Sequence, residues 1–505
     1  MFRTFCRILV VLFLCGGAGC AQAPTGLAAD FRTGDWWGGF GLIDGDRLHW
    51  THFIATLRAK GPGITGEGMY ITGPDQGRIS DKAIDISGAF RGETLRLRLS
   101  FDGRKVDCDL DLEAEHAAGA CVADGESLTL RMVRVASFDP AEASEIQSVY
   151  GFDEGRRILV GQIGPVPMML DLPSGQMRVL FPKGDGAWTA GPRMLVGHPE
   201  EWRLVFEKDE LRVERDGEAL RRGKRRPEPT TEEFSFTSER DGVTLRGTLT
   251  LPQGSGPHPG VVWVHGSGRT PRSEAMFFPR YMADLGFALL AFDKRGVGES
   301  GGKYAMPDGS TFNVSFLRRR GADVASAMNA LRRHPRIADR PVGLMGISQA
   351  GWVLPVAASS TECAFTISMS GGATRLSQEA HFSELTDELR SDAAARSIED
   401  ALAKVRARKP RGHDWSSDFA SQSCPGLWLY GLNDRINPSQ LAVEVLEAVK
   451  AEHGKDFTIV TFPEGNHPLM QSRLGGRAES VVLTGFVAGK FPTIEGWLEE
   501  RGFMP

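Results

Sequence analysis

The chain has 505 residues, of which 41% are hydrophobic and 24% are charged, and its formal net charge is −5. This length exceeds what one hydrophobic core supports, so about two or three domains are expected. The mild acidic balance gives no indication of a nucleic-acid partner, and after the N-terminus no apolar run is long enough to span a membrane.

Residues 1–20 have the pattern of a bacterial secretory signal. Arg3 and Arg7 supply the positive start, and residues 8–14 form an apolar run that is too short for a membrane span. The small residues that lead into Cys20 resemble a lipoprotein cleavage site. We therefore expect export to the periplasm, with either a lipid at Cys20 that anchors the protein in the outer membrane or simple cleavage nearby.

Two β-rich regions follow. Residues 34–137 contain alternating apolar and polar positions, as at 95–99, separated by turn residues such as the Asp-Gly pair at 102–103. We expect an antiparallel module there. Residues 138–220 contain further short apolar runs and are expected to form a second β region, either separate from the first sheet or completing it. The basic, proline-bearing run 221–229 is interpreted as a solvated linker.

From residue 230 the pattern changes to strands that alternate with helices. This alternation is typical of a mostly parallel sheet with helices on both faces, so residues 230–505 are assigned to one α/β domain. Apolar strands are expected at residues 260–265, 288–292, 342–345, 365–369, 427–430 and 457–462.

A serine motif lies where the strand at 342–345 turns into a helix. A nucleophile elbow needs this strand–turn–helix context, and it needs small neighbours around a serine held in a strained conformation. Gly346 and Gly351 are small neighbours of Ser348, and Ala350 stands in place of the second glycine of the usual G-x-S-x-G. Alone, the motif is equally compatible with a serine in an ordinary strand–helix turn.

An acid and a histidine follow later strands. A serine hydroxyl needs a base to take its proton, and the base needs a third group to orient it. In a parallel sheet the reactive groups gather at the carboxyl ends of the strands. Asp434 follows the penultimate expected strand, and His467 follows the last one. The order Ser348, Asp434, His467 is that of the α/β-hydrolase triad, with Glu464 as the alternative acid.

The oxyanion of a tetrahedral intermediate needs backbone donors placed in advance. We expect one donor to be the N–H of Gln349, directly after the serine. The other is expected in the loop that begins at His265, whose glycines allow the backbone to approach a substrate. The N–H of Ser267 is assigned this role, with that of Gly268 as the alternative, and His265 itself is interpreted as structural.

Over residues 230–505 these motifs resemble those of serine esterases of the α/β-hydrolase superfamily. Residues 293–300, Asp-Lys-Arg-Gly-Val-Gly-Glu-Ser, also resemble the D-x-R-G-x-G-x-S turn that follows a central strand in this superfamily. With its exported β region, the chain resembles the bacterial dienelactone-hydrolase-like and acyl-peptidase branches. The resemblance implies an α/β-hydrolase fold, with a cap over the active site at about residues 372–423.

Seven cysteines are present, and four of them follow the N-terminal segment. Cys363 and Cys424 each precede a strand, and the two strands should be parallel neighbours because only the cap connects them. Their Cα atoms should then lie within disulfide reach. Cys108 and Cys121 flank an expected hairpin connection and should pair across it. Both bonds are expected in an oxidising compartment, and the alternative is four reduced, buried thiols.

We therefore expect a carboxylic-ester hydrolase in which Ser348 forms the acyl-enzyme, His467 carries the proton and Asp434 orients His467. The expected partner is a small-molecule ester, with no metal, no organic cofactor and no nucleic acid, and with a membrane tether only through a lipid at Cys20. A serine peptidase or an acyltransferase on the same triad is the first alternative. A catalytically inactive binding protein is the second.

Overall fold

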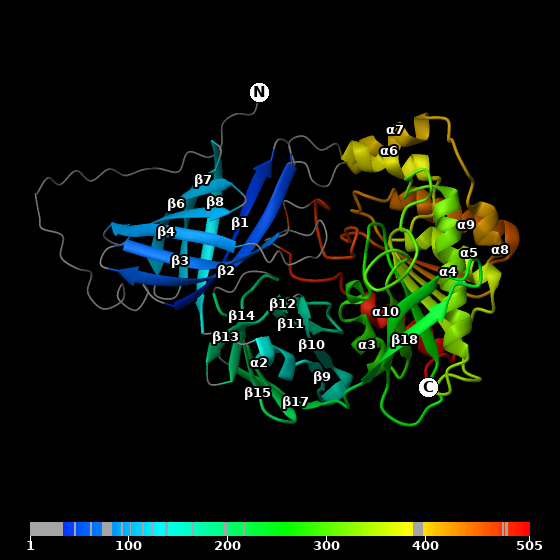
Figure 1. Cartoon of the computed structure of the whole chain (residues 1–505), viewed down its shortest axis with the longest axis horizontal. Coiled ribbons are helices and arrows are strands. Elements are labelled where there is room, and N and C mark those ends of the chain that lie inside the picture. The colour runs from blue at the N-terminus through cyan, green and yellow to red at the C-terminus, as the bar shows by residue number, and fades with distance from the viewer. Residues whose placement is uncertain are drawn as a thin grey trace, which may run out of the picture.

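The computed structural model describes residues 34–505 except 45–46, 61–62, 73–82, 92–93, 102, 114–115, 124, 137–139, 164–165, 185, 195–198, 216–217, 387–396, 477–478 and 480–482. The expected signal at residues 1–20, with Cys20, lies outside these ranges. The described strands form a closed barrel, a nine-stranded sheet and an eight-stranded sheet, in that order along the chain (Figure 1). Across the described ranges, no helix has both the length and the apolar character needed to cross a membrane.

The N-terminal module is an antiparallel barrel, which β1 closes by pairing with both β2 and β8. Buried and exposed residues alternate along β5, so one face of the strand points into the barrel. The interior is filled by side chains that include Trp36, Phe53 and Leu97. The strands are β1 (Gly34–Asp44), β2 (Arg47–Lys60), β3 (Gly63–Thr72), β4 (Ala83–Arg91), β5 (Thr94–Phe101), β6 (Arg104–Glu113), β7 (His116–Ala123) and β8 (Glu126–Val135).

The second β region is a separate antiparallel sheet, in the order β12-β11-β10-β9-β17-β16-β15-β14-β13. A short helix, α2 (Pro140–Glu145), precedes it. Its strands are β9 (Ser148–Gly151), β10 (Arg157–Ile163), β11 (Val166–Asp171), β12 (Met177–Val179), β13 (Phe181–Gly184), β14 (Ala187–Ala190), β15 (Trp202–Phe206), β16 (Glu210–Arg215) and β17 (Glu218–Arg225).

The linker expected at residues 221–229 is wrong in its first half, because residues 221–225 belong to β17. The strand does alternate: Arg222 and Lys224 are exposed, and Gly223 between them is buried. A Cβ at Gly223 would lie 2.6 Å from the ring of Phe152, so this ring occupies the space that a side chain would take at the inward position. Because the inward position holds a glycine and not an apolar residue, the sequence lacks the apolar–polar alternation that would predict a strand here.

The eight-stranded sheet has the order β18-β19-β21-β20-β22-β23-β24-β25. The first two pairings are antiparallel, and from β21 onward every pairing is parallel. The strands are β18 (Thr230–Thr237), β19 (Thr244–Leu251), β20 (Gly260–Val264), β21 (Ala288–Phe292), β22 (Val342–Ile347), β23 (Thr366–Met369), β24 (Gly426–Gly431) and β25 (Phe457–Phe462).

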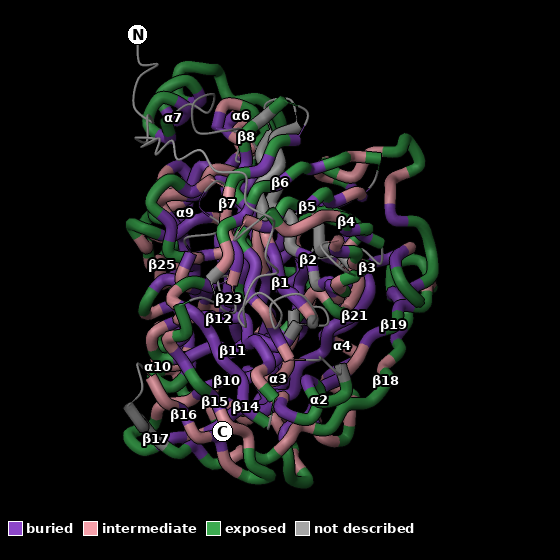
Figure 2. Tube along the Cα trace, turned by 90° about the vertical axis from the view of Figure 1, so that its left-hand side faces the viewer, coloured by how far each residue is buried: buried purple, intermediate pink, exposed green. Residues whose placement is uncertain are grey.

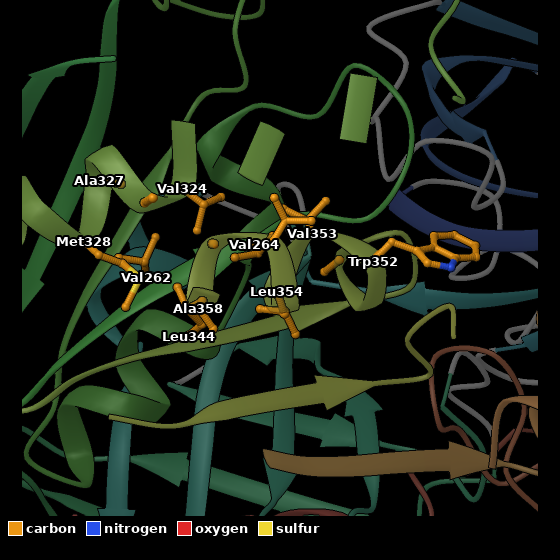
Figure 3. Close-up of a cluster of buried hydrophobic side chains, with 14 of the residues drawn as sticks. Val262, Val264, Val324, Ala327, Met328, Leu344, Trp352, Val353, Leu354 and Ala358 are labelled. Carbon is orange, nitrogen blue, oxygen red and sulfur yellow. The ribbon is translucent and has the colours of Figure 1, made fainter. Parts of the chain in front are cut away.

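Helices cover both faces of this sheet, so its central strands β20, β21, β23 and β24 are buried at every position. In β20, Val262 and Val264 point to one face, where they pack with residues of α4 and α5 such as Val324 and Val353 (Figure 3). Trp263 points to the other face, toward α3 and α10. The covering helices are α3 (Phe278–Asp284), α4 (Val314–Arg332), α5 (Ala350–Ser360), α9 (Ser439–His453) and α10 (Lys490–Glu500).

The nine-stranded sheet and the α/β region share one hydrophobic core. Leu159 of β10 and Leu170 of β11 belong to the same buried cluster as Phe277, Phe486 and Phe491. Figure 2 shows the tube at β10 and β11 largely in the colour of buried residues. At the edge of this core, Arg157 forms ion pairs with Asp284, at 2.8 Å, and with Glu495. The second β region is therefore joined to the α/β region by packing as well as by the chain.

The insertion between β23 and β24 contains α6 (Leu376–Thr386), α7 (Ile398–Ala407) and α8 (Ser416–Ser421). Phe382 of α6 and Leu402 of α7 form a small apolar cluster with Leu441 of α9. Figure 1 shows α6 and α7 together beside the rest of the α/β region. In the insertion expected as a cap, α6 and α7 thus form a small helical layer that packs on α9 through a shared apolar cluster.

Both expected cysteine pairs are present. Cys108 and Cys121 are direct register partners on β6 and β7, with Cα atoms 4.0 Å apart. Cys363 and Cys424 have Cα atoms 5.7 Å apart, and the strands that follow them, β23 and β24, are parallel neighbours as predicted. The second bond closes the helical insertion at its base.

Candidate active site

The backbone at Ser348 adopts the strained conformation of a nucleophile elbow. Its φ is +59°, a value that costs free energy for a residue with a side chain. Three backbone hydrogen bonds hold it there. The N–H of Ser348 donates to the carbonyl of Met369 at 3.0 Å, and the Ser348 carbonyl accepts from Gly351 at 2.9 Å and Gly372 at 3.0 Å. The strand beside β22 therefore fixes the turn.

Small residues make this turn sterically feasible. A Cβ at Gly351 would lie 2.4 Å from the nitrogen of Gly372, so any side chain there would displace the backbone. A Cβ at Gly346 would lie 2.5 Å from the Val264 carbonyl oxygen and 2.6 Å from the methyl of Ala350. Ala350 can replace the second glycine of the motif because Gly346 leaves room for its methyl group.

Asp434 and His467 form a buried pair. Oδ2 of Asp434 lies 2.8 Å from Nδ1 of His467, and the aspartate side chain is fully buried. Its other oxygen, Oδ1, accepts hydrogen bonds from the backbone N–H groups of Ile436 at 2.7 Å and Asn437 at 2.9 Å. The carboxylate therefore has a fixed orientation, with Oδ2 presented to the imidazole.

The alternative acid, Glu464, is placed differently. Its side chain is exposed, and Oε2 accepts a hydrogen bond at 3.1 Å from the amide of Gln471. The carboxylate that is hydrogen-bonded to His467 is that of Asp434.

The loop that begins at His265 runs directly against the elbow. A Cβ at Gly266 would lie 3.3 Å from the Cβ of Ser348. Among the described residues, the backbone N–H groups of Ser267 and Gln349 have no acceptor, which is the condition expected of donors reserved for a substrate oxygen. These donors are the two that the sequence suggested.

His265 is held inside the protein. Its Nε2 lies 3.0 Å from the carbonyl oxygen of Phe292, and its Nδ1 accepts a hydrogen bond from the indole of Trp263 at 3.2 Å. Burial lowers the pKa of His265 well below its ordinary value. Because both ring nitrogens of His265 have hydrogen-bond partners, this side chain links the end of β20 to the end of β21.

Glu379 of α6 is a site residue that sequence reasoning missed. Burial raises the pKa of Glu379 to about 7; the nearby His467 lowers it and Asp434 raises it further. Within the described ranges its carboxyl group makes no hydrogen bond or ion pair.

Hydrogen bonds at both ends of α6 hold this helix over the site. Before its start, the indole of Trp352 donates to the Thr374 carbonyl at 2.8 Å, and at its end the hydroxyl of Thr386 donates to a carbonyl beside Asp434.

Lys490 supports the loop of His467 from the other side. Its side chain is buried at the start of α10, and its Nζ lies 3.7 Å from the ring centroid of Phe486 and 3.3 Å from the carbonyl oxygen of Pro468. Burial lowers the pKa of Lys490 to about 7. Nothing in the sequence singles out this lysine, because its neighbours come from other segments.

In the described parts of the chain, no three His, Cys, Asp or Glu side chains are arranged to hold a metal ion.

Residues 324–471 match the family model described as BAAT / Acyl-CoA thioester hydrolase C terminal. The 2,6-dihydropseudooxynicotine hydrolase of Paenarthrobacter nicotinovorans is 28% identical over 268 residues, which cover 51% of this chain and 66% of that protein. The match thus spans just under two thirds of the relative's length.

Solved structures similar to this chain include an esterase from Pyrococcus furiosus, with 19% identity and a TM-score of 0.39. That match covers 55% of this chain and 92% of the esterase. A dienelactone hydrolase from Anabaena variabilis has 17% identity and a TM-score of 0.35, over 54% of this chain and 99% of that enzyme.

The family match begins in α4 and ends just after the loop of His467, so it spans the elbow, the helical insertion and the Asp434 loop. The sheet around it has parallel central strands in the order β21-β20-β22-β23-β24-β25, and the serine, the acid and the histidine follow three of them in the superfamily's order. Through residues 230–505, the chain has the α/β-hydrolase fold.

Proposed function

We propose that this protein hydrolyses carboxylic esters through an acyl-enzyme formed on Ser348. One observation carries the proposal. The hydrogen-bonded pair of Asp434 and His467, 2.8 Å apart, follows β24 and β25, while Ser348 follows β22 in the same parallel sheet. Parallel strands bring their carboxyl ends to one edge, so the three groups belong to one site.

In the acylation step, Oγ of Ser348 attacks the ester carbonyl carbon and passes its proton to Nε2 of His467. The N–H at Nδ1 donates to Asp434, so the negative carboxylate stabilises the imidazolium that forms. The tetrahedral intermediate places its negative oxygen on the N–H groups of Gln349 and Ser267. Collapse breaks the bond to the alcohol oxygen, which takes the proton from His467.

In the deacylation step, water replaces the alcohol. His467 takes a proton from the water, the hydroxide oxygen bonds to the acyl carbon, and the second tetrahedral intermediate uses the same two donors. Its collapse releases the carboxylic acid and returns the proton to the oxygen of Ser348. No other reactant is required.

The substrates we propose are esters of small to medium acyl groups. In the described part of the helical insertion, the exposed positions of α7 are mostly charged, among them Glu399, Asp400 and Lys404, which favours soluble esters over a lipid surface. A thioester of coenzyme A is the second candidate, because the family model that matches residues 324–471 is described by acyl-CoA thioester hydrolysis. Both substrates pass through the same acyl-enzyme.

A substrate panel tests this proposal. p-Nitrophenyl esters of increasing acyl length, acyl-CoA thioesters and aminoacyl anilides should be compared by kcat/KM on the full chain. Turnover of the short esters that is lost in Ser348→Ala supports ester hydrolysis. A preference for thioesters or anilides moves the assignment to those substrates, and transfer to an added amine in place of water identifies an acyltransferase.

Labelling by a fluorophosphonate separates an enzyme from an inactive binding protein. An activated serine should be phosphonylated, and peptide mapping should find the label on Ser348. Absence of label from the folded native chain, together with no turnover across the panel, would show that the site is inactive.

We also propose export to the periplasm, either as a free protein or tethered through a lipid at Cys20. The two cysteine pairs support this proposal, because disulfides persist in oxidising compartments. Fractionation of cells fed labelled palmitate would test it. Label in the native chain that is absent from Cys20→Ala identifies the lipid form, and a cytoplasmic, unlabelled chain contradicts export.

A further inference from the structure

Two buried cations bind the backbone of the loop at residues 265–268. The ammonium group of Lys294 donates to the carbonyl oxygens of Gly266 at 2.6 Å and Gly268 at 2.7 Å. The guanidinium group of Arg320 donates to the carbonyl oxygens of His265 at 2.7 Å and Gly266 at 3.3 Å. Together they bind three of the four carbonyl oxygens of residues 265–268, all except that of Ser267.

Neither cation has an acidic partner within ion-pair distance in the described parts of the chain. Nearby arginines differ in this respect. Arg295 is paired with Asp323 and Asp241, and Arg272 is paired with Asp293. Glu274 acts on Lys294, and Asp323 on Arg320, through charge alone, without an ion pair. Burying a charge without a directly paired counter-charge is costly, so a fold keeps such a group where its hydrogen bonds are needed. The acceptors of Lys294 and Arg320 are carbonyl groups of one loop and one side-chain amide.

The geometry of the peptide unit links these contacts to the oxyanion. In a planar trans peptide the C=O and the following N–H point in opposite directions. Fixing the Gly266 carbonyl oxygen therefore fixes the direction of the Ser267 N–H, the expected donor to the substrate oxygen. The loop contains Gly266 and Gly268, the latter at φ +80°, so its peptides would otherwise reorient readily.

Arg320 also reaches the second donor segment. Its Nη1 donates to Oε1 of Gln349, whose backbone N–H is the other expected donor. One guanidinium group on α4 thus holds both segments that contribute to the oxyanion hole. The side chain of Gln349 is 2% exposed, so this contact is shielded from water.

We propose that Lys294 and Arg320 are positioning residues that hold the oxyanion hole in its active arrangement by binding the carbonyl oxygens of residues 265, 266 and 268. This inference rests on the proposed ester hydrolysis. The two groups touch neither the substrate nor the reacting atoms; they orient the peptide units that do. Burial lowers the pKa of Lys294 well below its ordinary value, and an uncharged amine still has the two N–H groups that its two carbonyl partners require.

The test compares Lys294→Met and Arg320→Met with Arg319→Met in the full chain. Arg319 is the matched control, since it is the adjacent arginine of α4 and donates to the Tyr304 carbonyl at 2.6 Å, outside the loop. Loss of donor alignment should lower kcat on p-nitrophenyl esters roughly 10- to 100-fold with little change in KM, somewhat less than the loss of a donor itself. The rate of fluorophosphonate labelling of Ser348 should fall in parallel, because that reaction also places negative charge in the oxyanion hole.

A third variant separates positioning from folding. Lys294→Gln keeps a donor of similar length without a charge and should recover much of the kcat lost in Lys294→Met. Equal kcat, KM and labelling rates in folded Lys294→Met, Arg320→Met and Arg319→Met would overturn the proposal, as would a loss confined to KM. If both methionine variants unfold, Arg320→Lys decides, because a single ammonium group cannot bind the three acceptors of the guanidinium group. A native kcat in folded Arg320→Lys would then overturn the proposal. An inert native chain would instead overturn the proposed function.

Discussion

Oδ2 of Asp434 and Nδ1 of His467 lie 2.8 Å apart, and the opposite oxygen of the same carboxylate accepts two backbone N–H groups. The aspartate therefore cannot turn away from the imidazole without leaving buried donors unpaired. Because a carboxylate only accepts, the proton of neutral His467 resides on Nδ1, and Nε2 is the basic nitrogen. The pair is thus arranged so that the histidine can take a proton from a serine.

Asp434→Asn should lower kcat on the order of 10⁴-fold while leaving KM nearly unchanged, because an amide favours the wrong tautomer of His467. The control is Glu464→Gln, which removes an exposed carboxylate from the same region. Steady-state kinetics on one ester suffice. The reverse ranking of the two variants would mean that the acid has been misassigned.

Ser348→Ala should lower kcat on the order of 10⁵-fold or more, because no nucleophile remains. Ser348→Gly should be equally inactive but more stable than Ser348→Ala by about 0.5–1 kcal/mol, because φ is +59° at this position and glycine relieves the strain. Differential scanning calorimetry of the two variants measures the difference. An alanine variant as stable as the glycine variant would show that the elbow stores little strain.

The stability of Glu379→Gln relative to the native chain should depend on pH. The pKa of Glu379 is raised by burial to about 7, above its ordinary value of 4.5, so ionising the folded protein costs free energy that ionising the unfolded chain does not. The native chain should lose this stability as pH rises from about 4.5 to about 7, and the glutamine variant should not. Melting temperatures measured between about pH 5 and pH 8 should therefore diverge.

Glu384→Gln is the control for this measurement, since Glu384 is an exposed carboxylate on the same helix. Its melting temperature should follow that of the native chain at each pH. A difference between Glu379→Gln and the native chain that stays constant across the pH range would contradict a titration at Glu379.

Replacing Cys363 and Cys424 by serine should destabilise the α/β region by about 2–4 kcal/mol, because their bond closes a loop with a sequence separation of 61 residues. The bond lies before β23 and β24, at the strand ends opposite to the elbow, so kcat at room temperature should be retained. The temperature of half-inactivation should fall. In the control, serines at Cys108 and Cys121 of the barrel should leave that temperature unchanged.

Much of the site was predictable because its signals are local. Ser348, Asp434 and His467 each follow a short apolar run directly, so a reading of strand ends was sufficient to find them. The pairing of Cys363 with Cys424 followed from the same logic, because a parallel neighbour was the only partner that the insertion allowed.

Other features depend on contacts between distant segments and left no local signal. Arg320 is one of several arginines on α4, and its role depends on a carbonyl 55 residues away. Glu379 faces the site only because α6 is fixed by two other segments. The strand at residues 218–225 resembles a linker over part of its length because Gly223 takes the inward position that an apolar residue would mark.

The core shared by β10, β11 and the α/β region has a practical consequence for dissecting this protein. A cut at residue 229 would leave Phe277, Phe486 and Phe491 facing water, and a fragment that begins there should precipitate or recruit chaperones. The contact between the N-terminal barrel and the nine-stranded sheet is smaller. In the described residues, Trp37 and Val133 of the barrel pack with Val179 and Phe181 of the sheet in a small apolar cluster. The smallest fragment worth expressing therefore starts near residue 140. Recombination between homologues would have to exchange the nine-stranded sheet and the catalytic region together, as a single unit.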